Sequence, residues 1–390
     1  MTEEWVIAVI TSNASFVKNT EENTFNILFL LSDSCCKEAA GDFAQAAEKV
    51  VEKGCRAFVA VTKHINFKKE NPEISVIYAL KNSKAVGKNA DIIKEIIKKN
   101  NINIVHSCEP LLAVSADKAA EETGAKHITT VYKKYRKLSF KGFMFKRGMA
   151  KADLIIASSM PIAAMLKEVY KISESRIRTV YSGVDNEQFS PDTVEEATVL
   201  KTKAEMNIKN DEEVILLLSD SQSWEDDMDC VSEALRNIKD KWSLIIAVNG
   251  EEAEETADKI LEKTADGEWK DKIKVLHSED DITPDIFALS DIVLINGEKA
   301  NSSKIIMKAE SMGKIVVAEA QNQNADIIKN GLTSFLYEDE EGLVDTLDKV
   351  FAMTAKEKER ISATAINCAA SDFSNSTMRT KLFKAYEELI

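Results

Sequence analysis

The stretch ADLIIASSMPIAAMLKEVYKISESRIRTVYSGVDNEQFSP, which runs from Ala152 to Pro191, carries the clearest structural pattern of the sequence. Its apolar run Leu154–Ala157 predicts a buried strand, Pro161–Tyr170 a helix, and Ile177–Tyr181 a second short strand. A strand, a helix and a strand in this order are typical of a parallel sheet with crossover helices. The stretch lies near the middle of the 390 residues, where a two-domain chain would place its hinge.

Strands and helices alternate on both sides of this stretch. Upstream, we predict strands and helices in turn at Phe25–Leu31, Asp42–Lys53, Ala57–Val61, Ile74–Ala79, Asn89–Asn100, Ile102–His106, Leu112–Thr123 and His127–Val131. Downstream, the same alternation covers Glu213–Leu218, Asp227–Ile238, Ser243–Val248, Ala253–Thr264, Ile273–His277, Asp291–Ile295, Ser303–Met312 and Ile315–Ala318.

The alternation predicts an α/β protein with two Rossmann-like, doubly wound domains. The first would span residues 25–190 and the second residues 191–372. A last helix in residues 373–390 would cross back to the first domain, and residues 1–24 would form an N-terminal extension or an edge strand. Gly183, Asp185, Phe189 and Pro191 would form the hinge, because Gly permits the turn and Pro ends the segment.

Composition excludes several classes of protein. The chain is 44% hydrophobic and 30% charged, as globular proteins are, and its net charge of −14 argues against nucleic-acid binding. The acidic start MTEEWVIAVI does not predict a secretory signal, and no apolar run approaches the roughly 18 residues of a membrane helix. Six cysteines and four histidines lack metal-ligand spacing, so we expect no metal, no cofactor and reduced thiols. For the adjacent Cys35 and Cys36, a redox switch is the alternative.

Four further segments carry a family pattern in a fixed order. They are LKNSKAVGKNADIIKEIIKKNNINIVHS at 80–107, KHITTVYKKY at 126–135, EDDITPDIFALSDIVL at 279–294 and KAESMGKIVVA at 308–318. Together with the central stretch they resemble the retaining family-4 glycosyltransferases of the GT-B fold, in the alphaproteobacterial branch similar to lipopolysaccharide-core enzymes. The resemblance implies two domains facing a cleft that binds a nucleotide-diphosphate sugar, with Arg, Lys and helix N-terminal amides neutralising the diphosphate.

The diphosphate-binding loop of that family falls on SDSQSWED, Ser219 to Asp226. Only Trp224 matches. Asp220 stands at the position of the Arg, Glu225 at that of the Lys, and Asp226 at that of the following Gly. Two cations have become two anions, and like charges about 4 Å apart repel by about 4 kcal/mol at an effective dielectric of 20. We therefore expect a nucleotide sugar to be rejected.

Three other family positions are also replaced. The carboxylate pair that holds ribose and sugar falls on Ala300 and Lys308, and the first domain's His falls on Tyr132. The resemblance therefore assigns no catalytic residue. His106 ends a predicted strand at the carboxyl edge of the sheet, where ligands bind in this architecture, so it is either a cleft ligand or a structural His.

The segment YKKYRKLSFKGFMFKRGMAK, residues 132–151, holds eight Lys or Arg and no acid. Cations interleaved with aromatic residues suit an anionic membrane surface, where each Lys or Arg adds about 1 kcal/mol. The alternative is a solvated loop or helix whose aromatic residues pack into the core. The candidate surface consists of Lys133, Lys134, Arg136, Lys137, Lys141, Lys146 and Arg147.

Three hypotheses follow. In the first, the chain is a catalytically degenerate glycosyltransferase that binds or scaffolds envelope-glycan enzymes or lipid-linked glycans, in the cytoplasm or peripherally on the inner membrane. In the second, it is an active transferase that moves a sugar from a nucleotide-sugar donor to a lipid-linked or glycan acceptor through a diverged donor site. In the third, the cleft binds another small ligand.

Overall fold

The computed structural model describes residues 24–390 except 63, 64, 66, 68, 70, 237, 239, 240, 251, 266–268, 279–281, 298–301 and 322. The chain divides into two compact units. Unit 1 comprises the residues up to Gly183 together with Asn375–Ile390, and unit 2 comprises Val184–Ser374. The predicted N-terminal extension, apart from its last residue, lies outside the described residues.

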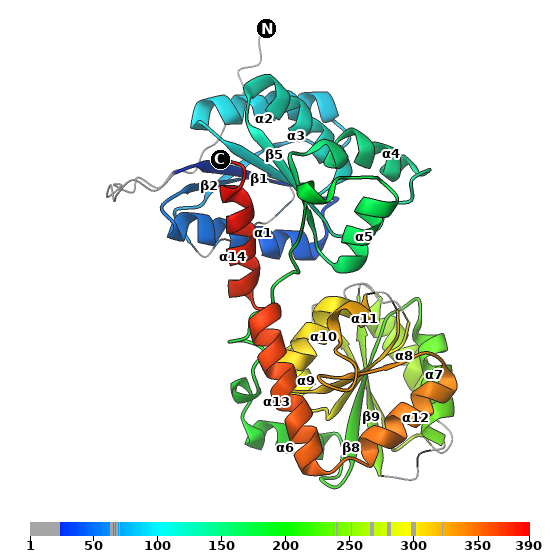
Figure 1. The fold of residues 1–390 in the computed structure, drawn as a ribbon. Helices are drawn as coiled ribbons and strands as arrows, with labels where there is room; N and C mark the ends of the chain where they lie inside the picture. The colour runs from blue at the N-terminus through cyan, green and yellow to red at the C-terminus, as the bar shows by residue number, and fades with distance from the viewer. Residues whose placement is uncertain are drawn as a thin grey trace. The chain divides into compact units, whose positions relative to one another are not determined.

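Unit 1 is built on a seven-stranded sheet in which every pair of neighbours is parallel. Its order is β3-β2-β1-β4-β5-β6-β7, so the winding reverses between β1 and β4. Strands β1, β2 and β5 of this sheet are labelled in Figure 1. The strands are β1 Asn26–Leu31, β2 Arg56–Thr62, β3 Ser75–Leu80, β4 Ile104–Ser107, β5 Lys126–Val131, β6 Leu154–Ala157 and β7 Ile177–Thr179. The helices are α1 Lys37–Glu52, α2 Val86–Asn100, α3 Pro110–Thr123, α4 Phe140–Arg147, α5 Met160–Glu168 and α14 Asn375–Glu387.

Unit 2 repeats this plan with six parallel strands in the order β10-β9-β8-β11-β12-β13. Its winding reverses between β8 and β11. The strands are β8 Glu213–Ser219, β9 Trp242–Asn249, β10 Ile273–Ser278, β11 Ile292–Ile295, β12 Ile315–Glu319 and β13 Phe335–Tyr337. The helices are α6 Glu196–Glu205, α7 Trp224–Arg236, α8 Ala253–Thr264, α9 Pro284–Ala288, α10 Ser302–Ser311, α11 Asn324–Ile327, α12 Glu340–Phe351 and α13 Ala355–Asp372. The predicted pair of doubly wound domains is confirmed.

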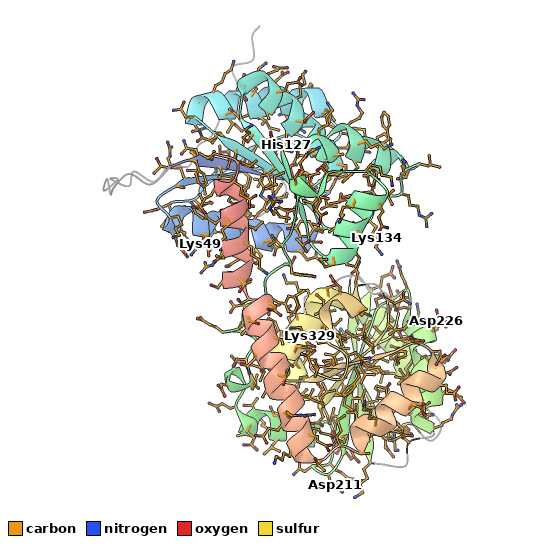
Figure 2. The ribbon with its side chains drawn as sticks, viewed as in Figure 1. Lys49, His127, Lys134, Asp211, Asp226 and Lys329 are labelled. Atoms are coloured by element: carbon orange, nitrogen blue, oxygen red, sulfur yellow. The ribbon has the colours of Figure 1, made fainter. Side chains whose placement is uncertain are left out.

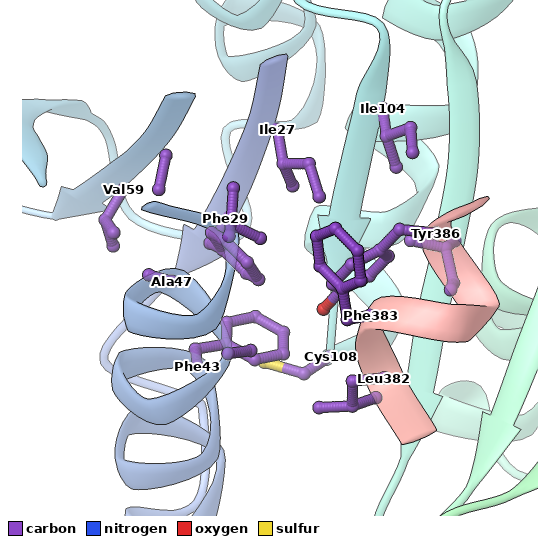
Figure 3. Packing of buried hydrophobic residues seen from close by; sticks show 14 of the residues in the cluster. Ile27, Phe29, Phe43, Ala47, Val59, Ile104, Cys108, Leu382, Phe383 and Tyr386 are labelled. Atoms are coloured by element: carbon purple, nitrogen blue, oxygen red, sulfur yellow. The ribbon is translucent and has the colours of Figure 1, made fainter. Parts of the chain in front are cut away.

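The last helix, α14, belongs to the core of unit 1, as predicted. Phe383 stacks on Phe25 with ring centroids 5.6 Å apart, and Tyr386 is fully buried beside Phe29. Figure 3 shows Phe383 and Tyr386 beside Phe29 and Phe43. Burying one such ring contributes about 1.5–3 kcal/mol, so α14 helps to stabilise a unit formed mainly by residues far upstream.

Several helix starts and several helices differ from the sequence prediction. Helix α1 begins at Lys37 rather than Asp42, α2 at Val86 rather than Asn89, and α7 at Trp224 rather than Asp227. In α7 the reason is a cap, because Asp220 satisfies the amides that precede the helix. Helices α4, α6, α9, α11, α12 and α13 were not predicted as elements. Within the described residues, no helix combines the length and apolarity needed to span a bilayer.

Candidate functional site

In parallel α/β sheets, ligands bind beyond the carboxyl ends of the strands where the winding reverses. In unit 2 this point, between β8 and β11, is occupied by a network centred on the buried Asp227. Ser219 Oγ donates to Asp227 Oδ2 at 2.5 Å, and Asn296 Nδ2 donates to Oδ1 at 3.1 Å. Tyr337 donates from its hydroxyl to Asn296 Oδ1 at 2.9 Å. The network joins three strand ends with the chain's own hydrogen bonds.

Asp220 lies at the same edge of the sheet and caps the backbone amides ahead of α7. Its Oδ1 accepts hydrogen bonds from the backbone nitrogens of Gln222 at 2.9 Å and Ser223 at 3.0 Å, and from Ser223 Oγ at 2.9 Å. Amides just before a helix are the groups that would bind a phosphate oxygen. Here a carboxylate of the chain already occupies them.

The first turn of α7 adds more negative charge. Glu225 and Asp226 are exposed there (Asp226 is labelled in Figure 2). Trp224 packs against the core of unit 2, and Lys263 Nζ lies 5.4 Å from its ring centroid. Lys263 pairs with Asp229 at 3.3 Å. The predicted loop residues are therefore brought together, although Trp224, Glu225 and Asp226 lie on a helix rather than in a loop.

Lys308 lies on α10, where its buried ammonium group sits 4.6 Å from the centroid of the Phe189 ring. Its predicted companion Ala300 lies outside the described residues. Two residues further along α10, Glu310 is completely buried, and that burial raises the pKa of its carboxyl to about 7.

The predicted hinge residues surround the point where the chain leaves unit 1. A Cβ on Gly183 would lie 2.7 Å from the Cα of Asn375, so no larger residue fits. The carboxylate of Asp185 accepts from the nitrogens of Glu187 and Gln188, both at 3.0 Å. Beyond this turn, the carbonyl of Phe189 accepts from Ser311 Oγ at 2.6 Å, and Pro191 opens a short turn of helix.

In unit 1, Tyr132 follows β5 and ties it to α1. Its hydroxyl donates to Asp42 Oδ2 at 2.9 Å, and Ser182 Oγ donates to the same oxygen at 2.7 Å. Burial and the neighbouring Asp42 raise the pKa of Tyr132, which stays neutral. Asp42 and Ser182 were not foreseen, because neither belongs to a local motif.

His106 is buried at the end of β4. Its Nδ1 lies 2.9 Å from the hydroxyl of Tyr386, and its Nε2 lies 2.8 Å from Thr130 Oγ1. Burial, with His127 nearby, lowers its pKa to about 3, so the ring is neutral. With both nitrogens engaged in the core, this arrangement favours the structural alternative.

The basic segment forms an exposed surface around α4, which we call the α4 surface. Its cations Lys133, Lys134, Arg136, Lys137, Lys141, Lys146 and Arg147 are all exposed. Three apolar side chains stand among them: Leu138 is fully exposed, Phe140 is 69% exposed and Phe143 is 54% exposed. Phe145 packs into the core instead. The α4 surface thus combines exposed cations (Lys134 is labelled in Figure 2) with exposed apolar side chains.

Two family models match the sequence. Residues 43–188 match Glycosyltransferase Family 4, and residues 212–352 match Glycosyl transferases group 1. No curated protein matches the chain.

Solved structures match nearly the whole chain. A glycosyltransferase from Rickettsia africae ESF-5 is 25% identical, with a TM-score of 0.81 over 94% of this chain and 99% of that one. Anabaena HepE, solved with UDP and glucose, is 15% identical, with a TM-score of 0.71 over 93% of this chain and 100% of that one. WaaG, a glycosyltransferase involved in lipopolysaccharide biosynthesis, is 12% identical, with a TM-score of 0.64 over 93% and 99%. The chain therefore has the GT-B fold, with a first segment similar to family-4 glycosyltransferases and a second segment similar to group 1 glycosyl transferases.

Proposed function

We propose that this chain is a glycosyltransferase-like protein of cell-envelope glycan assembly whose second unit no longer binds a nucleotide sugar. It would act by binding or scaffolding, with envelope-glycan enzymes or lipid-linked glycans as partners. The single observation that carries this proposal is the carboxylate of Asp220, which accepts from the amides of Gln222 and Ser223 ahead of α7.

A bound diphosphate and the Asp220 carboxylate would compete for the same hydrogen-bond donors. A diphosphate at this edge would have to displace the Asp220 carboxylate from its hydrogen bonds and remain beside it. Charge-assisted bonds of this kind contribute about 1.5–3 kcal/mol each. The displaced carboxylate would also repel the phosphate, and the exposed Glu225 and Asp226 would add to that repulsion.

The Asp227 network supports the same reading. Ser219 and Asn296 already donate to this buried carboxylate at the point where the winding reverses. A ligand there would meet side chains whose hydrogen bonds are made within the protein. The likeness to WaaG, a glycosyltransferase involved in lipopolysaccharide biosynthesis, supports the link with envelope glycans.

The α4 surface suggests where the protein works. We infer that it contacts an anionic lipid bilayer, because exposed Leu138, Phe140 and Phe143 can enter the headgroup region while the surrounding cations meet lipid phosphates. Within the described residues, none of its seven cations forms an ion pair with a carboxylate. A protein of net charge −14 would need such a local surface to approach an anionic membrane.

The rival function is an active transferase with a diverged donor site. The buried cation of Lys308 is the observation that favours it, since a cation on α10 could neutralise part of a donor's charge. A transfer assay separates the two: the protein is incubated with a panel of labelled nucleotide sugars and a lipid-linked glycan extract. We expect no labelled lipid. Sugar transfer that is lost on Lys308→Ala would establish the rival.

A further inference from the structure

Three cysteines meet at the carboxyl edge of the sheet in unit 1. Cys35 and Cys36 follow β1, and Cys108 follows β4, the two strands between which the winding reverses. The Sγ atoms of Cys35 and Cys108 lie 3.2 Å apart, although 73 positions separate them in the sequence. They need to approach by only about 1 Å to reach the bonded distance of a disulfide.

The sheet itself holds this pair in place. Strands β1 and β4 are direct neighbours, with Phe29 opposite His106. The nitrogen of Cys35 donates to the carbonyl of Ser32 at 2.9 Å, and the nitrogen of Ser32 donates to Cys35 Sγ at 3.3 Å. Cys108 is buried directly after β4 (Figure 3). The close approach is therefore fixed by backbone hydrogen bonds.

The three thiols are chemically different. The interaction between the two sulfur atoms lowers the pKa of Cys35 and raises that of Cys108. Burial raises the pKa of Cys36 to about 12, with Glu38 adding to the shift. Cys35 is also half-buried rather than buried, so it is the thiol that combines nucleophilic character with access. Cys108 is positioned as its partner.

We propose that Cys35 and Cys108 form a reversible disulfide when a hydroperoxide reaches unit 1. The Cys35 thiolate attacks the terminal peroxide oxygen, the O–O bond breaks, and the alkoxide, or hydroxide from hydrogen peroxide, leaves and takes up a proton. The Cys108 thiol then attacks the sulfur of the resulting sulfenic acid, the S–S bond forms, and the S–O bond breaks. The oxygen leaves as water with the Cys108 proton. The thiols lose two electrons, and the peroxide gains them.

This disulfide would join the turn before α1 to the end of β4. That is the ligand-binding edge of the fold, so oxidation would fix two of the segments that line it. This disulfide is independent of the proposed function, because the thiol pair lies in unit 1 and the proposed loss of nucleotide-sugar binding concerns unit 2.

Peptide mapping tests the proposal. The reduced full-length protein is treated with stoichiometric hydrogen peroxide, its remaining thiols are alkylated, and it is digested without reductant. Mass spectrometry should find a peptide that links Cys35 to Cys108 and disappears after dithiothreitol. Cys35→Ser should abolish it. Cys108→Ser should leave a sulfenic acid on Cys35 that dimedone traps.

Two matched controls keep the test specific. Cys36→Ser changes the adjacent thiol, and Cys230→Ser changes another half-buried thiol, in unit 2. Both variants should still form the linked peptide in wild-type yield. The proposal is overturned if peroxide oxidises Cys36 or Cys230 before Cys35, or if the wild-type protein shows no link once Cys35 is oxidised.

Discussion

At the scale of single residues, Glu310 is a buried carboxyl group whose ionisation affects the stability of unit 2. It lies fully buried on α10, and burial raises its pKa from 4.5 to about 7. The native state therefore holds the proton more tightly than the unfolded chain does. Stability is fully present below pH 4.5 and falls as the pH rises through about 7, because the buried group must then ionise.

Replacing this carboxyl by a neutral amide should remove that pH dependence. We expect Glu310→Gln to raise the free energy of unfolding at pH 8 by up to about 3 kcal/mol, and to change it much less at pH 4.5. Urea unfolding followed by tryptophan fluorescence measures this, because Trp224, Trp242 and Trp269 all report on unit 2. The exposed Glu338→Gln is the control and should have little effect at either pH. An equal effect of Glu310→Gln at both pH values would contradict the assignment.

Gly183 carries a steric prediction. An added Cβ would lie 2.4 Å from Asn375 Oδ1 and 2.7 Å from Asn375 Cα, where backbone would have to move. We expect Gly183→Ala to lower the free energy of unfolding by about 1–3 kcal/mol. Gly41→Ala is the matched control, because Gly41 lies within α1 with nothing within 4 Å of the added carbon. Thermal unfolding should show it slightly more stable, by about 0.5–1 kcal/mol. Equal effects of the two variants would contradict this account.

At the scale of elements, the alternation of strands and helices was predicted well from the sequence, and the helix caps were predicted poorly. Apolar runs such as Leu154–Ala157 coincide with β6, because a strand buried on both faces is continuously apolar. The start of α7 was wrong by three residues, because Asp220 was interpreted by family position and not as a cap. The Cys35–Cys108 and Tyr132–Asp42 contacts were out of reach, since each joins segments more than 70 residues apart.

The α4 surface leads to a prediction about binding to anionic membranes. Wild-type protein should float with liposomes that contain anionic lipid and should remain in solution with neutral ones. Charge reversal of Lys133, Lys134, Arg136 and Lys137 to Glu should abolish flotation, since about 1 kcal/mol per cation is lost and repulsion is added. Reversal of Lys356, Arg360, Lys381 and Lys384, exposed cations outside the α4 surface, is the control and should leave flotation intact. If wild-type and reversed proteins both stay in solution, the membrane proposal fails.

At the scale of the whole molecule, the two units share one plan and differ in what fills the reversal point of the sheet. In unit 1 a thiol pair lies there, and in unit 2 a carboxylate network does. The GT-B fold depends on buried strands and on α14, none of which requires a sugar donor. The fold can therefore persist without a bound donor, so the likeness to glycosyltransferases is compatible with the proposed loss of donor binding.

The most direct test is isothermal titration of UDP, ADP and GDP into the wild-type protein and into Asp220→Arg/Glu225→Lys. We predict no saturable heat for the wild-type protein at millimolar nucleotide, and measurable binding once the two cations are restored, because the repulsion is removed and the amides ahead of α7 are released. Micromolar binding of any of these diphosphates by the wild-type protein, unchanged by the double substitution, would contradict the account.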